Sequence, residues 1–201
     1  MKDVDKYLYY TSEITSILDR RDISDIIDVL AKIKESNSRV FCLGLGGGAS
    51  IASHAVNDLR KLCGIKAYTP TDNVAEFTAW INDVSWEGSF REYLINSKLS
   101  DKDCLFIFSV GGGNVREKVS VNIIEALLYA IYVSAKIVGI VGRDGGETKK
   151  YANACVVIPT VSKELITPLT ESFQSVILHL IVTHPKLKEN NTFWENQKQY
   201  S

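Results

Sequence analysis

Two pairs of ionisable residues in this sequence have spacings that suit acid/base chemistry. His54 and Asp58 are four residues apart in a stretch with helical character, so both side chains share one helical face. Glu171 and His179 are eight residues apart in a later amphipathic stretch, about 12 Å along a helix axis, and can line one elongated site. A lone histidine beside an apolar stripe is usually a packing residue, but two imidazole–carboxylate pairs on two helices favour a functional site.

The same four side chains form a possible metal-binding set. Two imidazoles and two carboxylates can bind Zn²⁺ tetrahedrally through nitrogen and oxygen. They can equally form a hydrogen-bonded acid/base network without a metal, and the sequence leaves both alternatives open. The remaining histidine, His184, precedes Pro185 and is expected to interact with the dipole at a helix C-terminus.

Three glycine-rich segments follow apolar, strand-like runs, at residues 44–50, 109–114 and 142–146. Such turns expose backbone N–H groups and the positive end of a helix dipole, which suits a phosphate group. Because ligands of open α/β sheets bind beyond the carboxyl ends of the strands, the three loops predict a phosphorylated ligand at that edge. Residues 44–46 loosely match a dinucleotide fingerprint, but the acidic residue required at the end of the next strand is missing.

The elements that must position these groups alternate between strands and helices. Apolar runs predict strands at residues 39–45, 65–69, 103–109, 136–142 and 154–159, and amphipathic stretches predict helices at residues 49–63, 86–96, 120–134, 144–153 and 168–183. This alternation predicts an α/β fold with a doubly wound, five-stranded parallel sheet flanked by helices. The first 38 residues predict two more helices, the second capped by Asp22. The expected core stripe of the last helix consists of Leu169, Phe173, Val176, Ile177 and Leu180.

Length and composition are consistent with one globular domain. The 201 residues are expected to form a single unit, with N-terminal helices at 1–38, an α/β core at 39–184 and a C-terminal tail at 185–201. The 23 Lys and Arg against 24 Asp and Glu leave a net charge of −1, which argues against nucleic acid or an anionic membrane as the main partner. The charged start lacks a signal-peptide pattern, no apolar run suits a membrane span, and four cysteines form no CxxC pair. A cytoplasmic protein with free thiols is therefore expected.

Several motifs in the chain resemble the sugar isomerase (SIS) domain family. They are the segment Ser53-His54-Ala55-Val56-Asn57-Asp58-Leu59 after the first glycine loop, Thr78-Ala79-x-x-Asn82-Asp83, Ser109 at the end of the third strand, and Gly142-x-Asp144-Gly145-Gly146. Within the family the match is to the phosphoheptose isomerases and runs from about Arg39 to His184. The chain departs from that pattern in its phosphate loop, which reads SVGGGN at residues 109–114 instead of Ser-Thr-Ser-Gly-Asn-Ser, with several residues inserted before Ser120 and with Gly48 in place of a serine.

The resemblance implies conversion of D-sedoheptulose 7-phosphate to D-glycero-D-manno-heptose 7-phosphate through an enediol, feeding nucleotide-activated heptose synthesis for surface polysaccharide. It implies no organic cofactor and a homotetramer with sites between subunits. Asp58 is the expected base and His179 its acid/base partner. Some phosphoheptose isomerases carry zinc at positions that match His54, Asp58, Glu171 and His179. The expected substrate contacts are Gly47, Gly48, Asp83, Ser109, Gly111, Gly112, Ser120 and Glu171.

Three other functions compete with this interpretation. A non-catalytic sugar-phosphate-binding regulator would keep the glycine loops and lose the base. A nucleotide-dependent oxidoreductase would need the dinucleotide site that the sequence matches only loosely. An isomerase or deacetylating enzyme that acts on another sugar phosphate, such as an amino sugar phosphate, would use the same fold. The presence of all four ionisable groups favours an enzyme over a regulator.

Overall fold

A five-stranded sheet in the order β2-β1-β3-β4-β5 lies at the centre of the computed structural model, which describes residues 2–196. Every pairing between neighbouring strands is parallel. The predicted doubly wound parallel sheet is therefore confirmed, and the chain reverses its winding direction between β1 and β3. The strands are β1 (Arg39–Gly44), β2 (Lys66–Tyr68), β3 (Cys104–Ser109), β4 (Lys136–Val141) and β5 (Ala154–Val157).

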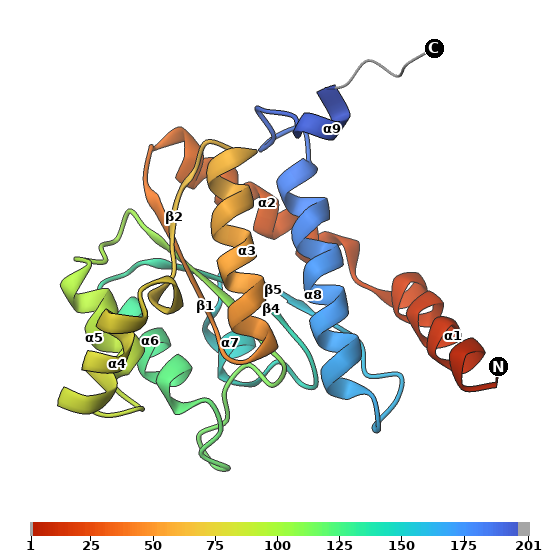
Figure 1. The fold of residues 1–201 in the computed structure, drawn as a ribbon, viewed down its shortest axis with the longest axis horizontal. Helices are drawn as coiled ribbons and strands as arrows, with labels where there is room; N and C mark the ends of the chain where they lie inside the picture. The colour runs from red at the N-terminus through yellow and green to blue at the C-terminus, as the bar shows by residue number, and fades with distance from the viewer. Residues whose placement is uncertain (1, 197–201) are drawn as a thin grey trace.

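Helices cover both faces of the sheet (Figure 1). One face packs against α2 (Arg20–Glu35), α3 (Gly47–Lys61) and α8 (Ile166–Thr183). The other face packs against α4 (Val74–Asp83), α5 (Ser89–Asn96), α6 (Val121–Tyr132) and α7 (Gly146–Tyr151). A short 3₁₀ turn at Pro70–Asp72 precedes α4, and α9 (Phe193–Asn196) ends the described chain. On the first face α3 and α8 lie side by side, which decides where their polar residues meet.

Alternating residues of the central strands divide the core into two layers. Phe106 and Phe108 of β3 point toward α2, α3 and α8, with ring centroids 4.4 Å apart. Leu105 and Ile107 of the same strand join the layer beneath α5 and α6. Because β3 is buried on both faces, its sequence is apolar at successive positions, as expected for a central parallel strand.

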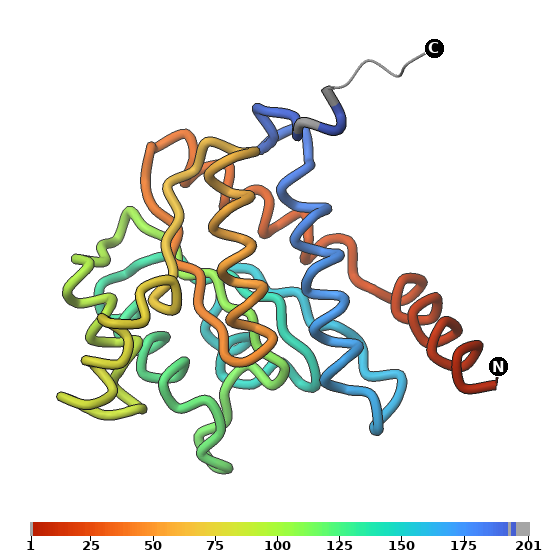
Figure 2. Tube along the Cα trace, viewed as in Figure 1, coloured from red at the N-terminus to blue at the C-terminus, as the bar shows by residue number. Residues whose placement is uncertain are grey.

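The N-terminal helix α1 (Lys2–Ile17) reaches out from the body of the molecule (Figure 2). Its single buried residue is Ile14, whereas α2 buries its whole predicted apolar stripe. The expected cap at Asp22 is wrong, because the side chain of Asp19 accepts the backbone N–H of Arg21 and Asp22 lies in the first helical turn. The helix begins at Arg20, so the capping position falls on the aspartate immediately before it.

Helix α8 buries only part of its predicted core stripe. Leu169, Phe173 and Ile177 are buried, but Val176 is 56% exposed and Leu180 is 46% exposed. The prediction is wrong for these two residues because α3 and the sheet contact a narrower sector of the helix. Both residues line a hollow of about 330 Å³ between α8 and the junction of α1 with α2.

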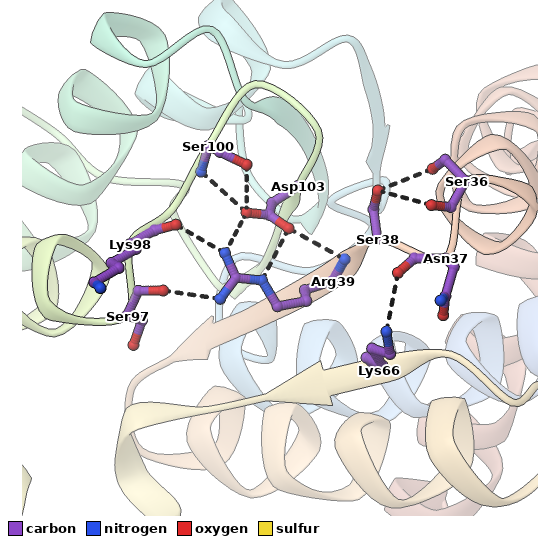
Figure 3. Close-up of polar contacts among 9 residues, drawn as sticks. All are labelled: Ser36, Asn37, Ser38, Arg39, Lys66, Ser97, Lys98, Ser100 and Asp103. Carbon is purple, nitrogen blue, oxygen red and sulfur yellow. Dashed lines mark hydrogen bonds and ion pairs between the residues drawn. The ribbon is translucent and has the colours of Figure 1, made fainter.

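An ion pair fixes β1 to the segment before β3 at the amino end of the sheet (Figure 3). Nη2 of Arg39 lies 2.7 Å from Oδ2 of Asp103, and the guanidinium also donates to the carbonyl oxygens of Ser97 and Lys98. Asp103 accepts further hydrogen bonds from the backbone N–H and hydroxyl of Ser100. Burial opposes the charge of Asp103, yet these hydrogen bonds outweigh it and lower the pKa of that carboxyl.

We expect Asp103→Asn to reduce the free energy of unfolding at neutral pH by about 1.5–3 kcal/mol, the range for hydrogen bonds to charged groups. Since the folded-state pKa is depressed, the stabilisation is complete above the unfolded-state pKa and is lost as the pH falls through the folded-state value. Urea denaturation of both proteins across this pH range measures the difference. The exposed Asp101→Asn is the control, with an expected change within about 0.5 kcal/mol. An equal loss in both variants would contradict the prediction.

Two further sequence expectations bear on the fold. All four cysteines are free, and Cys42, Cys63 and Cys104 are buried. Among residues 2–196, no helix combines the length and apolarity needed to cross a bilayer.

Candidate active site

Two glycines allow the start of α3 to lie directly against the sheet. A Cβ atom on Gly44 would overlap the backbone of Gly48, and a Cβ atom on Gly48 would overlap the carbonyl oxygen of Phe108 near the end of β3. No side chain larger than hydrogen fits at these positions. The first glycine loop therefore places the N-terminus of α3 beside the carboxyl ends of β1 and β3, where a ligand of such a fold binds.

The second glycine loop follows β3 and is held in a defined conformation. The buried hydroxyl of Ser109 accepts the N–H of Gly112 at 3.0 Å. Gly112 and Gly113 adopt left-handed φ angles of 69° and 87°, which glycine accepts without strain. The carbonyl oxygen of Gly112 accepts the N–H and the hydroxyl of Thr148 at 2.9 and 2.8 Å. Within residues 2–196 the N–H groups of Gly111 and Gly113 have no acceptor, so both can donate to a ligand.

The residues inserted after this loop form a closed turn. Asn114 and Val119 pair as an antiparallel bridge, with N–H···O distances of 3.0 and 3.1 Å. Ser120 then adopts a left-handed φ of 54° immediately before α6, and its side chain makes no capping hydrogen bond. The hydroxyl groups of Ser109 and Ser120 are the two that survive from the expected phosphate loop.

His54, Asp58 and His179 bring their side chains together between α3 and α8. Nε2 of His54 lies 3.0 Å from Nε2 of His179 and 3.2 Å from Oδ2 of Asp58, and Nε2 of His179 lies 3.7 Å from the same oxygen. A hydrogen bond between two imidazole nitrogens requires one donor and one acceptor, so at least one of the two rings is neutral. The predicted shared face of His54 and Asp58 is present, and α8 supplies the third group.

The cluster combines a buried carboxylate with two rings that are open to solvent. The side chain of Asp58 is 9% exposed, whereas those of His54 and His179 are 48% and 52% exposed. The amide of Asn57 donates to Oδ1 of Asp58 at 2.9 Å, which leaves Oδ2 directed at the imidazoles. The sequence did not single out Asn57, because neither its type nor its spacing distinguishes it from an ordinary helical residue.

Gln174 is a second residue that the sequence analysis missed. It is fully buried, and its Nε2 donates to the carbonyl oxygen of Ile140 at 2.8 Å, which ties α8 to β4. This contact fixes the rotation of α8 and thus the side from which His179, five positions later, reaches α3. A polar residue next to an apolar stripe was the only signal in the sequence.

Glu171 does not join the cluster. Its carboxylate lies against Gly47, where a Cβ atom would overlap it. In the described chain, three potential metal-ligand atoms lie within 4.8 Å of one another, and they belong to His54, Asp58 and His179. Glu171 and His179 are eight residues apart on α8, which is about two helical turns. Glu171 therefore lies beside the N-terminal end of α3, away from the cluster.

Asp83 also stands apart from the cluster. It ends α4, is exposed, and accepts a hydrogen bond from the amide of Asn82 at 2.8 Å. No hydrogen bond or ion pair within residues 2–196 links it to His54, Asp58 or His179. Its contact with substrate stays a prediction.

Thiol chemistry does not fit this site. Burial raises the pKa of all four cysteines, that of Cys63 to about 11 and that of Cys155 to about 12. A thiolate nucleophile requires the opposite shift. The ionisable groups that remain for proton transfer are the imidazoles and the carboxylate of the cluster.

The donor set of the cluster fits a divalent cation such as zinc. Two imidazole nitrogens and one carboxylate oxygen, all within 4.8 Å, match catalytic zinc sites that have three protein ligands and an open fourth position. Metal-bound histidines usually donate their second N–H to a carboxylate, a backbone carbonyl or water. Within residues 2–196 neither Nδ1 of His54 nor Nδ1 of His179 has a protein acceptor, and both rings are about half exposed to solvent.

Proteins similar in sequence to the chain include a lincomycin biosynthesis protein and several phosphoheptose isomerases. LmbN, a lincomycin biosynthesis protein of Streptomyces lincolnensis, is 34% identical over 148 residues, 70% of this chain and 54% of that protein. The chain thus spans about half the length of that relative. A phosphoheptose isomerase of Geotalea daltonii is 25% identical over 164 residues, 79% of this chain and 80% of the isomerase. No protein-family profile matches the chain.

The structure of the phosphoheptose isomerase of Neisseria gonorrhoeae has the same fold, with a TM-score of 0.76 at 18% identity over 90% of this chain and 95% of that one. The chain is therefore similar in sequence to phosphoheptose isomerases and shares the fold of a solved one. These similarities support the resemblance that the sequence motifs indicate. The chain carries the imidazole–carboxylate cluster, and its second glycine loop is where it departs from the pattern that the resemblance implies.

Proposed function

We propose that the chain isomerises D-sedoheptulose 7-phosphate to D-glycero-D-manno-heptose 7-phosphate in the cytoplasm, feeding nucleotide-activated heptose synthesis. The observation that carries the proposal is the His54–Asp58–His179 cluster, which provides a fixed carboxylate and two imidazoles between α8 and the helix that follows the first glycine loop. Relatives named phosphoheptose isomerase support the seven-carbon substrate. A regulator that only binds sugar phosphates would have no need for an oriented carboxylate next to solvent-facing imidazoles.

Aldose–ketose isomerisation needs one group to move a proton between carbons and another to move a proton between oxygens. In the proposed mechanism Asp58 removes a proton from C1 of the open-chain ketose, and the electron pair forms the enediol double bond as O2 accepts a proton. His179 gives that proton to O2 and takes the proton of O1. Asp58 then returns a proton to C2, which yields the aldose. Each well-positioned group contributes about 10²–10⁴-fold to the rate.

The phosphate end of the substrate is assigned to the second glycine loop. The hydroxyl groups of Ser109 and Ser120 and the N–H groups of Gly111 and Gly113 are the donors available there. Gly112 sets the loop conformation by its left-handed φ and its contact with Thr148.

The middle of the sugar chain is assigned to the N-terminus of α3, between the phosphate donors and the cluster. Gly47 and Gly48 form this part of the site, with Glu171 lying against Gly47 and available to the sugar hydroxyl groups. Asp83, on α4, is a further proposed contact for the sugar.

A bound Zn²⁺ would be held by His54, Asp58 and His179 and would act as a Lewis acid toward the substrate oxygens. Metal analysis of protein purified without a histidine tag, together with an activity assay after chelator treatment, tests whether the site holds a catalytic metal. Stoichiometric zinc and loss of activity on chelation would establish a catalytic metal. Full activity of a metal-free preparation, with chelator present, would leave Asp58 and His179 as unassisted acid/base groups.

An assay of the purified chain with ketose phosphates of five, six and seven carbons tests the function. Separation of the isomeric products should show turnover of D-sedoheptulose 7-phosphate without nicotinamide or nucleotide. In deuterated water the product should carry deuterium at C2, because the carboxyl proton of Asp58 exchanges with solvent. Turnover of only a different ketose phosphate would move the proposal to that substrate, and an absence of turnover for all of them would reject it.

We further expect a homotetramer. Helix α1 exposes the apolar side chains of Val4, Leu8 and Ile17. Helix α8 exposes Val176 and Leu180 beside an apolar hollow. Association with other copies of the chain would bury these apolar surfaces. Analytical ultracentrifugation should give a species of four chains, and Val176→Glu should shift it to smaller species. A fully active 22.4 kDa monomer at micromolar concentration would contradict the prediction.

A further inference from the structure

The second glycine loop leaves the charge of a substrate phosphate uncompensated. A phosphate monoester carries close to two negative charges at neutral pH. The available donors of the loop, the hydroxyls of Ser109 and Ser120 and the N–H groups of Gly111 and Gly113, are all neutral. A cation from a neighbouring loop would add a charge-assisted hydrogen bond, roughly twice as strong as a neutral one.

Three cationic residues lie in the loops that follow β3 and β4: Arg116, Lys118 and Arg143. Arg116 shares a hollow with Asp144 and Glu147. Lys118 shares another hollow with Glu87 and Glu125. Each of these two cations thus lines a hollow that also contains two carboxylates.

Arg143 differs from the other two in its position. Its side chain runs over the second glycine loop, since a Cβ atom on Gly111 would lie 3.8 Å from its Cδ. Arg143 is exposed, and its guanidinium makes no hydrogen bond or ion pair in the part of the chain from 2 to 196. Within the described residues Arg143 is therefore an unpaired cation whose side chain reaches Gly111, a residue whose N–H group has no acceptor.

The backbone at Arg143 is strained and held in place. Its φ of 53° is left-handed, a conformation that costs a non-glycine residue about 1–3 kcal/mol and tends to be kept at functional sites. On one side of it the N–H of Gly142 donates to the carbonyl oxygen of Val110 at 3.1 Å, and on the other the N–H of Gly145 donates back to Gly142 at 2.9 Å. Arg143 thus lies in a turn between β4 and α7, and Thr148 of α7 is hydrogen-bonded to Gly112 of the second glycine loop.

We infer that Arg143 is the cationic anchor for the phosphate group of the ligand, taking over part of the role of the hydroxyl groups that the second glycine loop lacks. Its planar guanidinium can donate two parallel hydrogen bonds to phosphate oxygens. This inference rests on the proposed function only for the identity of the sugar. The requirement for a phosphate group on the ligand does not depend on the proposed isomerase activity.

Calorimetric binding of three probes, inorganic phosphate, D-sedoheptulose 7-phosphate and unphosphorylated D-sedoheptulose, tests the inference. Arg143→Met should raise the Kd for the two phosphate-containing probes by about 10–100-fold and leave that for the unphosphorylated sugar unchanged. Arg143→Lys should lie between wild type and Arg143→Met, because lysine keeps the charge and loses the paired geometry. In steady-state assays the loss should fall on KM rather than on kcat.

Two further variants make the outcome unambiguous. Arg143→Gly accepts the left-handed backbone without strain, so weakened phosphate binding in this variant cannot be ascribed to misfolding. Arg116→Met removes the nearby alternative cation and should bind phosphate as wild type does. Wild-type phosphate affinity in Arg143→Met, or a loss in Arg116→Met as large as the one expected for Arg143→Met, would overturn the inference. A protein that binds sugar phosphates through Arg143 without isomerising them would refute the proposed function alone.

Discussion

Asp58→Asn is expected to lower kcat by about 10²–10⁴-fold, equivalent to about 3–5 kcal/mol of transition-state stabilisation. Asparagine has nearly the same shape and keeps an oxygen to accept the amide of Asn57, but it cannot take up a proton. The effect should therefore appear in kcat and in kcat/KM with little change of KM. Steady-state assays with D-sedoheptulose 7-phosphate, together with thermal denaturation, measure both the chemistry and the fold.

Two matched variants separate this effect from a general loss of negative charge. Glu171→Gln removes a carboxylate that lies against Gly47, outside the cluster, and should reduce kcat far less than Asp58→Asn does. Asp25→Asn changes an exposed carboxylate on α2 and should have parental activity. A near-parental kcat for Asp58→Asn would show that the base does not lie on α3.

The features that the sequence predicted correctly are those encoded by local patterns. The strand at Cys104–Ser109 is buried at every position, so a continuous apolar run announced it. The contact between His54 and Asp58 follows from helical periodicity alone. The glycine loops could likewise be placed at one sheet edge, because all parallel strands end there.

The features that the sequence missed depend on tertiary contacts. Which sector of α8 is buried depends on its packing against α3 and on the hydrogen bond of Gln174 to β4, so the exposure of Val176 could not be read from periodicity. The separation of Glu171 from the cluster depends on the same rotation of the helix. Arginine rarely adopts a left-handed backbone conformation, so the residue type at position 143 does not predict one. The hydrogen bonds of the neighbouring loop impose this conformation.

His179→Ala is expected to lower kcat by about 10²–10⁴-fold as well, because proton transfer between O1 and O2 loses its carrier. The side chain is 52% exposed, so its removal should change the free energy of unfolding by no more than about 0.5 kcal/mol. His184→Ala is the matched control, a histidine at the C-terminal end of the same helix whose Nδ1 accepts only the N–H of Lys186.

Of the two histidines, His179 is the one whose ring contacts His54 and Asp58. Parental kcat in His184→Ala with a large loss in His179→Ala would locate the proton carrier in the cluster. Added imidazole should restore part of the activity of His179→Ala, because the solvent-open position of the ring allows a small base to enter the vacated space. It should not accelerate Asp58→Asn, in which the missing group is a buried carboxylate. Equal losses of kcat in the two histidine variants would contradict the assignment of His179. Such a result would indicate a general effect on α8 and not the loss of a specific proton carrier.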